Sequence, residues 1–188
     1  FAACVAAAQH GAVDHVHHLV DIAGGSGTFA IPLAQRRPTV RISLIELPRS
    51  VPHTRRFLSA YGAGGQVQVL AGDVVQRPRL PACDGIFIGN LIHDLGDGDC
   101  LRLLAACRMA LAEGGSLWLH ERLWNENKDG PLLTAQWNFI MMTHSREGKQ
   151  RTAGEIHRLF EAAQFVPGAV VPTAAGFTMV EGRVVASR

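Results

Sequence analysis

Short apolar runs alternate with amphipathic segments along the chain from His18 nearly to its end. Runs typical of buried strands occupy residues 18–23, 40–46, 66–72, 83–90 and 116–121. Helical spacing of apolar residues occurs at 28–35, 49–61 and about 101–111, and we expect Gly114 and Gly115 to end the third of these helices. Helical segments at 132–143 and 152–163 and two extended stretches complete the pattern.

This order predicts one doubly wound α/β domain over residues 1–188. Strands that alternate with helices form a mainly parallel sheet, and such sheets bind ligands at the carboxyl ends of their strands. The last two strands have no helix between them, so we expect them to form an antiparallel edge. A length of 188 residues is enough for one domain with its own hydrophobic core.

Composition and charge narrow the class of protein. Hydrophobic residues make up 47% and charged residues 18% of the chain, which excludes extended disorder. A net charge of +2 and 6% aromatic residues argue against a nucleic-acid partner. The longest uncharged stretch, residues 165–180, carries two prolines and two glycines and is not a membrane span. The four cysteines form no CxxC pair, so we expect free thiols and a cytoplasmic protein.

The segment DIAGGSGTFA at residues 21–30 is the first candidate ligand site. Gly25, Gly27 and Ala30 satisfy the GxGxxG/A pattern directly after a strand and at the start of a helix. In that setting a ligand approaches the backbone closely and meets the free N–H groups of the helix. Glu46 follows at the end of the second strand, where an acid accepts hydrogen bonds from ribose hydroxyls. The pattern by itself fits a nicotinamide dinucleotide or S-adenosylmethionine.

Asp21 favours S-adenosylmethionine over the dinucleotide. A carboxylate just before the glycines repels a pyrophosphate, whereas it attracts the ammonium and sulfonium groups of S-adenosylmethionine. Asp73 ends the third strand, and an acid there accepts from the adenine amino group, although an ordinary turn aspartate is the alternative.

His93 and Glu121 are candidates for acid–base chemistry. His93 follows the fourth strand and Glu121 ends the fifth, so both belong to the edge of the sheet that carries the glycine loop. A histidine oriented by a carboxylate is the arrangement that a general base needs.

Six segments in this order resemble the motifs of a known family: DIAGGSG, IELP, AGDV, LIHDLGDGD, EGGSLWLHERL and QRTAGEIHRLFEAAQF. They are similar to S-adenosylmethionine-dependent O-methyltransferases of the plant caffeate and bacterial natural-product type, over residues 20–166. The resemblance implies a class I methyltransferase fold with a seven-stranded sheet. It also implies metal-independent methylation of a hydroxyl, usually phenolic, on a small acceptor of secondary metabolism.

The resemblance also assigns roles to particular residues. His93 matches the base that takes the hydroxyl proton, and Glu121 matches one of two carboxylates that hold this histidine. Residues that match the cofactor site are Gly24, Gly25, Gly27, Glu46, Leu47, Asp73, Val74 and Asn90, with Asp21 beside them. Met141 matches a position that packs on the acceptor, and Trp137 and Asn138 are further acceptor-pocket candidates. Plain helix core is the alternative for Trp137 and Met141.

Four positions depart from the family pattern. Ala23 replaces the first glycine of the loop, and Leu95 replaces a tryptophan whose aromatic face would stack on adenine. Gly89 stands where plant members often have lysine. Gln150 replaces the second carboxylate near the histidine, so we expect Glu121 alone to orient His93 and the pKa of His93 to be less elevated than in relatives with both acids.

Family members carry a winged-helix-like N-terminal domain that forms a homodimer and closes part of the acceptor pocket. This chain begins at Phe1, and we expect that domain to be missing from it. We therefore expect the chain to bind the cofactor, to methylate poorly and to self-associate through apolar surface.

Three alternatives remain at this stage. The bare glycine pattern also fits a nicotinamide-dependent oxidoreductase. A member of the fold that binds the cofactor without methylating, as a hydroxylase or a binding partner, is the second. A metal site at His15, His17 and His18 is the third, but these histidines lack an ordered spacing with acids, so we expect no metal.

Overall fold

In the computed structural model, which describes residues 2–185, seven strands form one sheet in the order β3-β2-β1-β4-β5-β7-β6. The strands are β1 (His18–Ile22), β2 (Arg41–Glu46), β3 (Val67–Ala71), β4 (Cys83–Gly89), β5 (Leu111–Glu121), β6 (Val166–Pro172) and β7 (Thr178–Arg183). The helices are α1 (Ala2–Gln9), α2 (Ala30–Arg36), α3 (Val51–Ala60), α4 (Asp97–Ala110), α5 (Leu132–His144) and α6 (Ala153–Ala162), with 3₁₀ turns η1 (Gly11–Val13) and η2 (Ile92–Asp94).

The sheet has the strand directions of a class I methyltransferase. Strands β1 to β5 run parallel, and β7 is antiparallel to both β5 and β6. The predicted parallel sheet and its antiparallel edge are therefore confirmed. Alternate residues of the central strands face opposite sides because side chains alternate along a strand.

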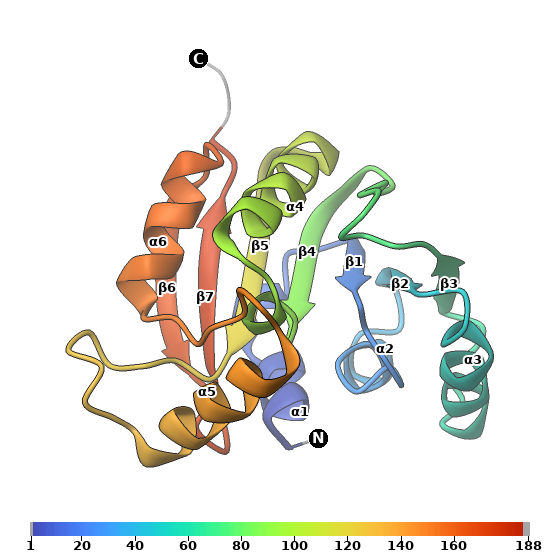
Figure 1. Cartoon of the computed structure of the whole chain (residues 1–188). Coiled ribbons are helices and arrows are strands. Elements are labelled where there is room, and N and C mark those ends of the chain that lie inside the picture. The colour runs from blue at the N-terminus through green and yellow to red at the C-terminus, as the bar shows by residue number, and fades with distance from the viewer. Residues whose placement is uncertain (1, 186–188) are drawn as a thin grey trace.

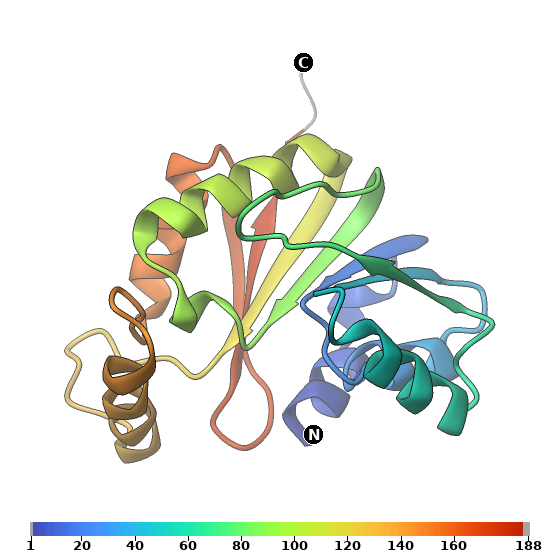
Figure 2. The same cartoon turned by 45° about the vertical axis from the view of Figure 1, so that its right-hand side comes forward.

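Helices cover both faces of the sheet (Figures 1 and 2). Helices α4 and α6 pack on one face, over a core that includes Val20, Ile86 and Leu117. The other face packs against α1, α2 and α3 through a core that includes Leu19 and Trp118. The central strands β1, β2, β4 and β5 are buried on both faces, which explains their continuous apolar runs.

Two local predictions need correction. Helix α4 ends at Ala110, before the glycines that were expected to end it, and β5 already begins at Leu111. Gly114 and Gly115 lie where the pairing of β4 with β5 shifts from Cys83↔Leu111 to Gly85↔Ser116, so these glycines accommodate a bulge. Helix α1 was not predicted at all, because its run of small residues has no polar–apolar period.

The strand order reverses between β1 and β4, and this is the point at which doubly wound sheets bind ligands. The carboxyl ends of the parallel strands meet along one edge, and α5 lies beyond that edge (Figure 1). Helix α6 starts from a capping box in which Thr152 and Glu155 each bond the other's backbone N–H. All four cysteines are free, and no helix within residues 2–185 is long and apolar enough to cross a membrane.

Candidate active site

The glycine loop passes directly over the end of β1. A Cβ atom at Gly24 would lie 2.6 Å from Asp21 Oδ2 and 2.6 Å from Leu44 Cγ, so only glycine fits there without a shift. The backbone N–H of Gly25 donates to Glu46 Oε1 at 3.0 Å, which joins the loop to the end of β2. Gly27 packs beside Ile31 of α2 and is directed into the core.

A cavity of about 290 Å³ opens beside this loop at the ends of β2 and β3. Its lining includes four predicted cofactor residues: Glu46, Leu47, Asp73 and Val74. Ala23, Ile45, Gly72, Val75, Gln76 and Leu91 complete the lining. The cavity therefore combines two acids with an apolar wall, which matches the needs of a nucleoside: acceptors for hydroxyl and amino groups, and apolar contact for a ring.

Both acids of the cavity are held by backbone donors. Glu46 Oε2 accepts from the N–H of Leu47 at 2.7 Å. Asp73 Oδ1 accepts from the N–H groups of Val75 and Gln76 at 3.1 and 3.0 Å. Asp73 therefore has the turn role considered as the alternative, and it lines the cavity as well.

Asp21 does not line the cavity, because the glycine loop covers it. Its exposed fraction is 1%, and its Oδ2 atom has no hydrogen-bond partner. Burial, and after it the nearby charge of Glu46, raise the pKa of Asp21 to about 8 against the opposing effect of a hydrogen bond from the Ala30 backbone. Repulsion of a pyrophosphate, as predicted from the sequence, requires Asp21 to be an ionised carboxylate. At neutral pH an acid with this pKa is mostly protonated, so simple repulsion of a pyrophosphate is not the way it would select a ligand.

His93 and Glu121 form the buried pair that the sequence predicted. His93 Nδ1 lies 2.7 Å from Glu121 Oε2, and the two residues are 5% and 2% exposed. Glu121 Oε1 accepts from the backbone N–H groups of Leu91 and Ile92 at 2.8 and 3.0 Å. Both carboxylate oxygens of Glu121 therefore have hydrogen-bond partners: one oxygen holds the His93 ring, and the other holds the turn that carries His93.

The pKa of His93 reflects opposing influences. Burial is the largest and lowers the pKa, but the hydrogen bond and charge of Glu121, joined by the charge of Asp94, outweigh it and leave the pKa raised above 6.5. The carboxylate keeps the proton on Nδ1, and the lone pair of Nε2 is then available to accept a proton.

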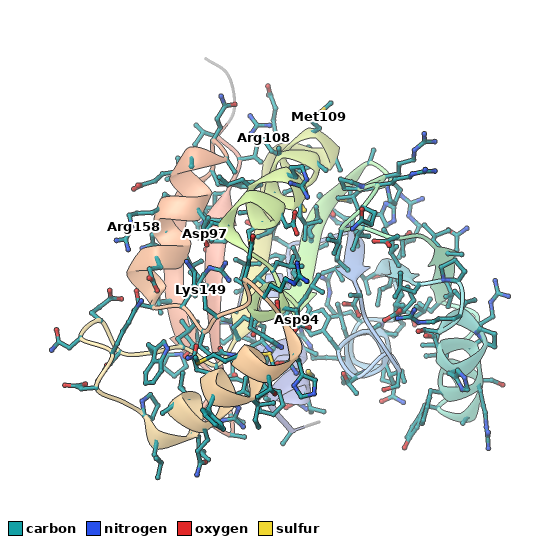
Figure 3. The ribbon with its side chains drawn as sticks, viewed as in Figure 1. Asp94, Asp97, Arg108, Met109, Lys149 and Arg158 are labelled. Carbon is teal, nitrogen blue, oxygen red and sulfur yellow. The ribbon has the colours of Figure 1, made fainter. Side chains whose placement is uncertain are left out.

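Arg151 is a structural part of the site that the sequence reading missed. Its guanidinium is buried and donates to the carbonyl oxygens of Ile92 and Leu95 at 2.6 and 2.9 Å, and to Asp97 Oδ1 at 2.7 Å. Lys149 bonds the other oxygen of Asp97, and Figure 3 shows Asp97 and Lys149 close together beside α4. Arg151 fixes both ends of η2, the turn that carries His93. No signal in the sequence marks this role, because the carbonyl partners belong to a turn far from Arg151 along the chain.

Gln150 lies beside the pair but does not bond it. The residue is 2% exposed, and both its Nε2 and its Oε1 lack a hydrogen-bond partner. It lines a narrow gap with His93, Glu121 and Arg151 that is too small to admit water. Glu121 is thus the carboxylate that holds His93, as expected.

Helix α5 brings the predicted acceptor residues to the same edge. The Trp137 ring meets the His93 ring edge-on, with 6.1 Å between the centroids and 80° between the planes. Met141 is buried, and Asn138 Oδ1 accepts from the backbone N–H of Gln150 at 2.9 Å. Asn138 therefore connects α5 to the segment before α6.

The remaining departures from the family pattern, and the cofactor candidate Asn90, can each be placed in the structure. Leu95 is buried in the core under α4 and is not part of the cavity lining. A Cβ at Gly89 would lie 2.8 Å from the Phe87 ring, which stacks on Phe29. Asn90 is exposed at the end of β4 and does not line the cavity. Ala23 has a φ of 53°, a conformation that favours glycine, so this replacement carries strain.

Two of the three histidines considered for a metal, His15 and His18, contact different partners. His15 faces the Trp118 ring, and His18 Nε2 bonds Ser43 Oγ at 2.8 Å. Within residues 2–185 no three His, Cys, Asp or Glu side chains converge in a way that would hold a metal ion.

The fold and the paired residues at the sheet edge define a class I methyltransferase domain. A family model described as an O-methyltransferase domain matches residues 4–166, so the chain belongs to that family. Norreticuline-7-O-methyltransferase of Papaver somniferum is 28% identical over 168 residues, which cover 87% of this chain and 44% of the relative. Acetylserotonin O-methyltransferase of Rattus norvegicus is 32% identical over 147 residues, which cover 78% of this chain and 34% of the relative.

Solved structures give the same result. Human N-acetylserotonin methyltransferase in complex with S-adenosylmethionine superposes with a TM-score of 0.86 at 26% identity, over 97% of this chain and 51% of that chain. An O-methyltransferase family 2 protein from Planctomyces limnophilus in complex with apigenin has a TM-score of 0.84 at 28% identity, over 89% of this chain and 51% of that chain. The chain thus spans less than half the length of the two curated relatives and about half of these solved chains.

Proposed function

We propose that the protein transfers a methyl group from S-adenosylmethionine to a hydroxyl of a small aromatic acceptor, with His93 as the general base. The buried His93–Glu121 pair, 2.7 Å apart at the carboxyl edge of the sheet, is the observation that carries the proposal. Membership of the O-methyltransferase family supports the reaction type.

The residues around the cavity fit the cofactor. Glu46 is the acceptor for the ribose hydroxyls, Asp73 for the adenine amino group, and Leu47 and Val74 supply apolar contact. Gly24 and Gly25 leave the backbone open to the amino-acid end of the cofactor. When bound, the cofactor supplies an activated methyl group, so the chain's own task is to position the acceptor and to remove its proton.

His93 takes that proton at Nε2. Glu121 accepts the Nδ1 proton, fixes the tautomer and stabilises the imidazolium that forms. Because the pKa of His93 lies above 6.5, a fraction of the histidine is protonated and inactive near neutral pH. Activity should therefore increase as the pH rises through this pKa.

The acceptor would lie between His93 and α5. Trp137 and Met141 offer apolar contact for an aromatic ring, and Asn138 lies next to Trp137, about one helical turn before Met141. The relatives are named for norreticuline and acetylserotonin, and one solved neighbour holds apigenin. We infer a small hydroxylated aromatic acceptor and, for the whole protein, a homodimer.

A panel of hydroxyarenes incubated with methyl-labelled S-adenosylmethionine tests the reaction. Transfer of label to a phenolic oxygen, with a product 14 mass units heavier, is the expected result (CH₂ added). The proposed reaction would be contradicted if the cofactor lost its label and no methylated acceptor formed. Binding of NADH in place of S-adenosylhomocysteine would also contradict it.

Gln150 favours one second candidate, a protein that binds the cofactor without methylating. Its amide cannot stabilise an imidazolium as a carboxylate would, and both of its polar atoms lack partners. A hydroxylated product, 16 mass units heavier, or unchanged acceptor in the panel would favour this candidate.

A further inference from the structure

Asp21 is a buried acid that the proposed chemistry does not use. It pairs with Leu44 of β2 and Phe87 of β4 in the middle of the sheet, and its Oδ2 atom is buried without a hydrogen-bond partner. A buried polar atom without a hydrogen bond lowers the free energy of unfolding by about 1–3 kcal/mol relative to one that has a partner. A polar atom kept at that cost calls for an explanation.

Within residues 2–185, the charge that acts on Asp21 is the negative charge of Glu46, and no cation offsets it. Its carboxyl lies under Gly24, at the 2.6 Å approach that excludes a Cβ. Two titratable groups face it: Glu46 at the end of β2 and the thiol of Cys4 on α1. Burial raises the pKa of the Cys4 thiol, so that group is uncharged at neutral pH.

A cation at the glycine loop would change this balance. In the empty site, burial and Glu46 keep Asp21 protonated, with a pKa of about 8. A positive charge on the other side of Gly24 would favour the ionised form, since opposite charges a few ångströms apart lower the pKa of an acid. S-adenosylmethionine carries an ammonium and a sulfonium, whereas S-adenosylhomocysteine carries the ammonium alone.

We propose that Asp21 makes the cofactor site sensitive to charge: it is protonated in the empty site and releases its proton when the sulfonium cofactor binds over Gly24. The proton passes from the carboxyl to solvent on binding. After methyl transfer the sulfur is uncharged, and the carboxyl recovers a proton from solvent. Asp21 thereby favours the cofactor over its product. The proposal rests on the proposed use of S-adenosylmethionine.

Calorimetric titration in two buffers of different ionisation enthalpy measures the protons released on binding. Between pH 6 and 7 we expect close to one proton per S-adenosylmethionine and fewer for S-adenosylhomocysteine, and the release should fall to about half a proton at pH 8, where about half of Asp21 is already ionised. The affinity for S-adenosylmethionine should rise by up to about tenfold per pH unit over that range. In Asp21→Asn, a change of similar size and no charge, the release and this pH dependence disappear. The difference between wild type and variant cancels protons exchanged by the ligand's own amino group.

His93→Ala is the matched control, because His93 is a second buried titratable group near the site and its pKa is raised by Glu121. The proton release should persist in that variant. Equal release with both ligands, or release that survives in Asp21→Asn, overturns the proposal. If Asp21→Asn does not fold, the comparison of the two ligands on the wild type decides.

The titration needs no acceptor and no turnover. A protein that binds the cofactor and never methylates would refute the proposed function and leave this proposal standing. Equal proton release with both ligands would refute the proposal on Asp21 and leave the proposed function standing. Failure of both ligands to bind would refute the proposed cofactor and this proposal together.

Discussion

Replacing Glu121 by glutamine removes the charge that holds His93 while keeping the size of the side chain. Charge-assisted hydrogen bonds contribute about 1.5–3 kcal/mol, and one pKa unit corresponds to about 1.4 kcal/mol. Loss of the 2.7 Å bond should therefore lower the pKa of His93 by about one to two units. Burial then dominates, and the pKa falls below the 6.5 of a free imidazole. The amide also donates to Nδ1, which moves the ring proton to Nε2 and blocks the base.

An NMR titration of the imidazole resonances measures this shift, with His93→Ala to assign the signal. Asp94→Asn is the matched control, because Asp94 Oδ1 is 3.7 Å from Nε2 and its side chain is half exposed. At this distance a half-exposed carboxylate contributes little, so the control should shift the pKa of His93 by about 0.5 unit or less. An unchanged His93 titration in Glu121→Gln, or an equal shift in the control, would refute the assigned role of Glu121.

Three further outcomes follow from the geometry. Gln150→Glu adds a carboxylate to the narrow gap beside His93 and should raise the pKa of His93. The acid limb of the pH–rate profile should then move to higher pH, and an unchanged profile would contradict this. Ala23→Gly should raise the free energy of unfolding by about 1 kcal/mol in urea denaturation, because it relieves a φ of 53°, and a loss of stability would contradict it. Gly24→Ala should lower that free energy by about 1–3 kcal/mol, since its Cβ meets Asp21 and Leu44 at 2.6 Å. The loss should exceed that of Gly65→Ala, whose Cβ has no neighbour within 4 Å and whose backbone is outside the left-handed region.

Most of the fold could be predicted from the sequence, because the strands are buried on both faces and therefore read as continuous apolar runs. The order of acids at the strand ends also located Glu46, Asp73 and Glu121, since parallel strands end along one edge. Local exceptions could not be predicted. The bulge at Gly114 depends on how β5 pairs with β4, and a pair of glycines after a helical pattern indicates a helix end equally well.

One part of the candidate site could be predicted from the sequence, and two parts could not. The pairing of His93 with Glu121 follows from two strand ends that are neighbours in the sheet. The protonation of Asp21 could not be predicted, because it depends on the depth of the carboxyl under the glycine loop. The role of Arg151 depends on carbonyl oxygens of a turn that becomes its neighbour only in the folded chain.

The central claim is that His93 removes the proton of the acceptor hydroxyl. Its most direct test compares wild type with His93→Ala, measuring turnover with a phenolic acceptor and, separately, the dissociation constant of S-adenosylhomocysteine. A general base contributes about 10²–10⁴-fold, so turnover should fall by that factor while the dissociation constant stays nearly unchanged. A variant that keeps the full rate would show that positioning alone drives the transfer, and would contradict the assignment of His93.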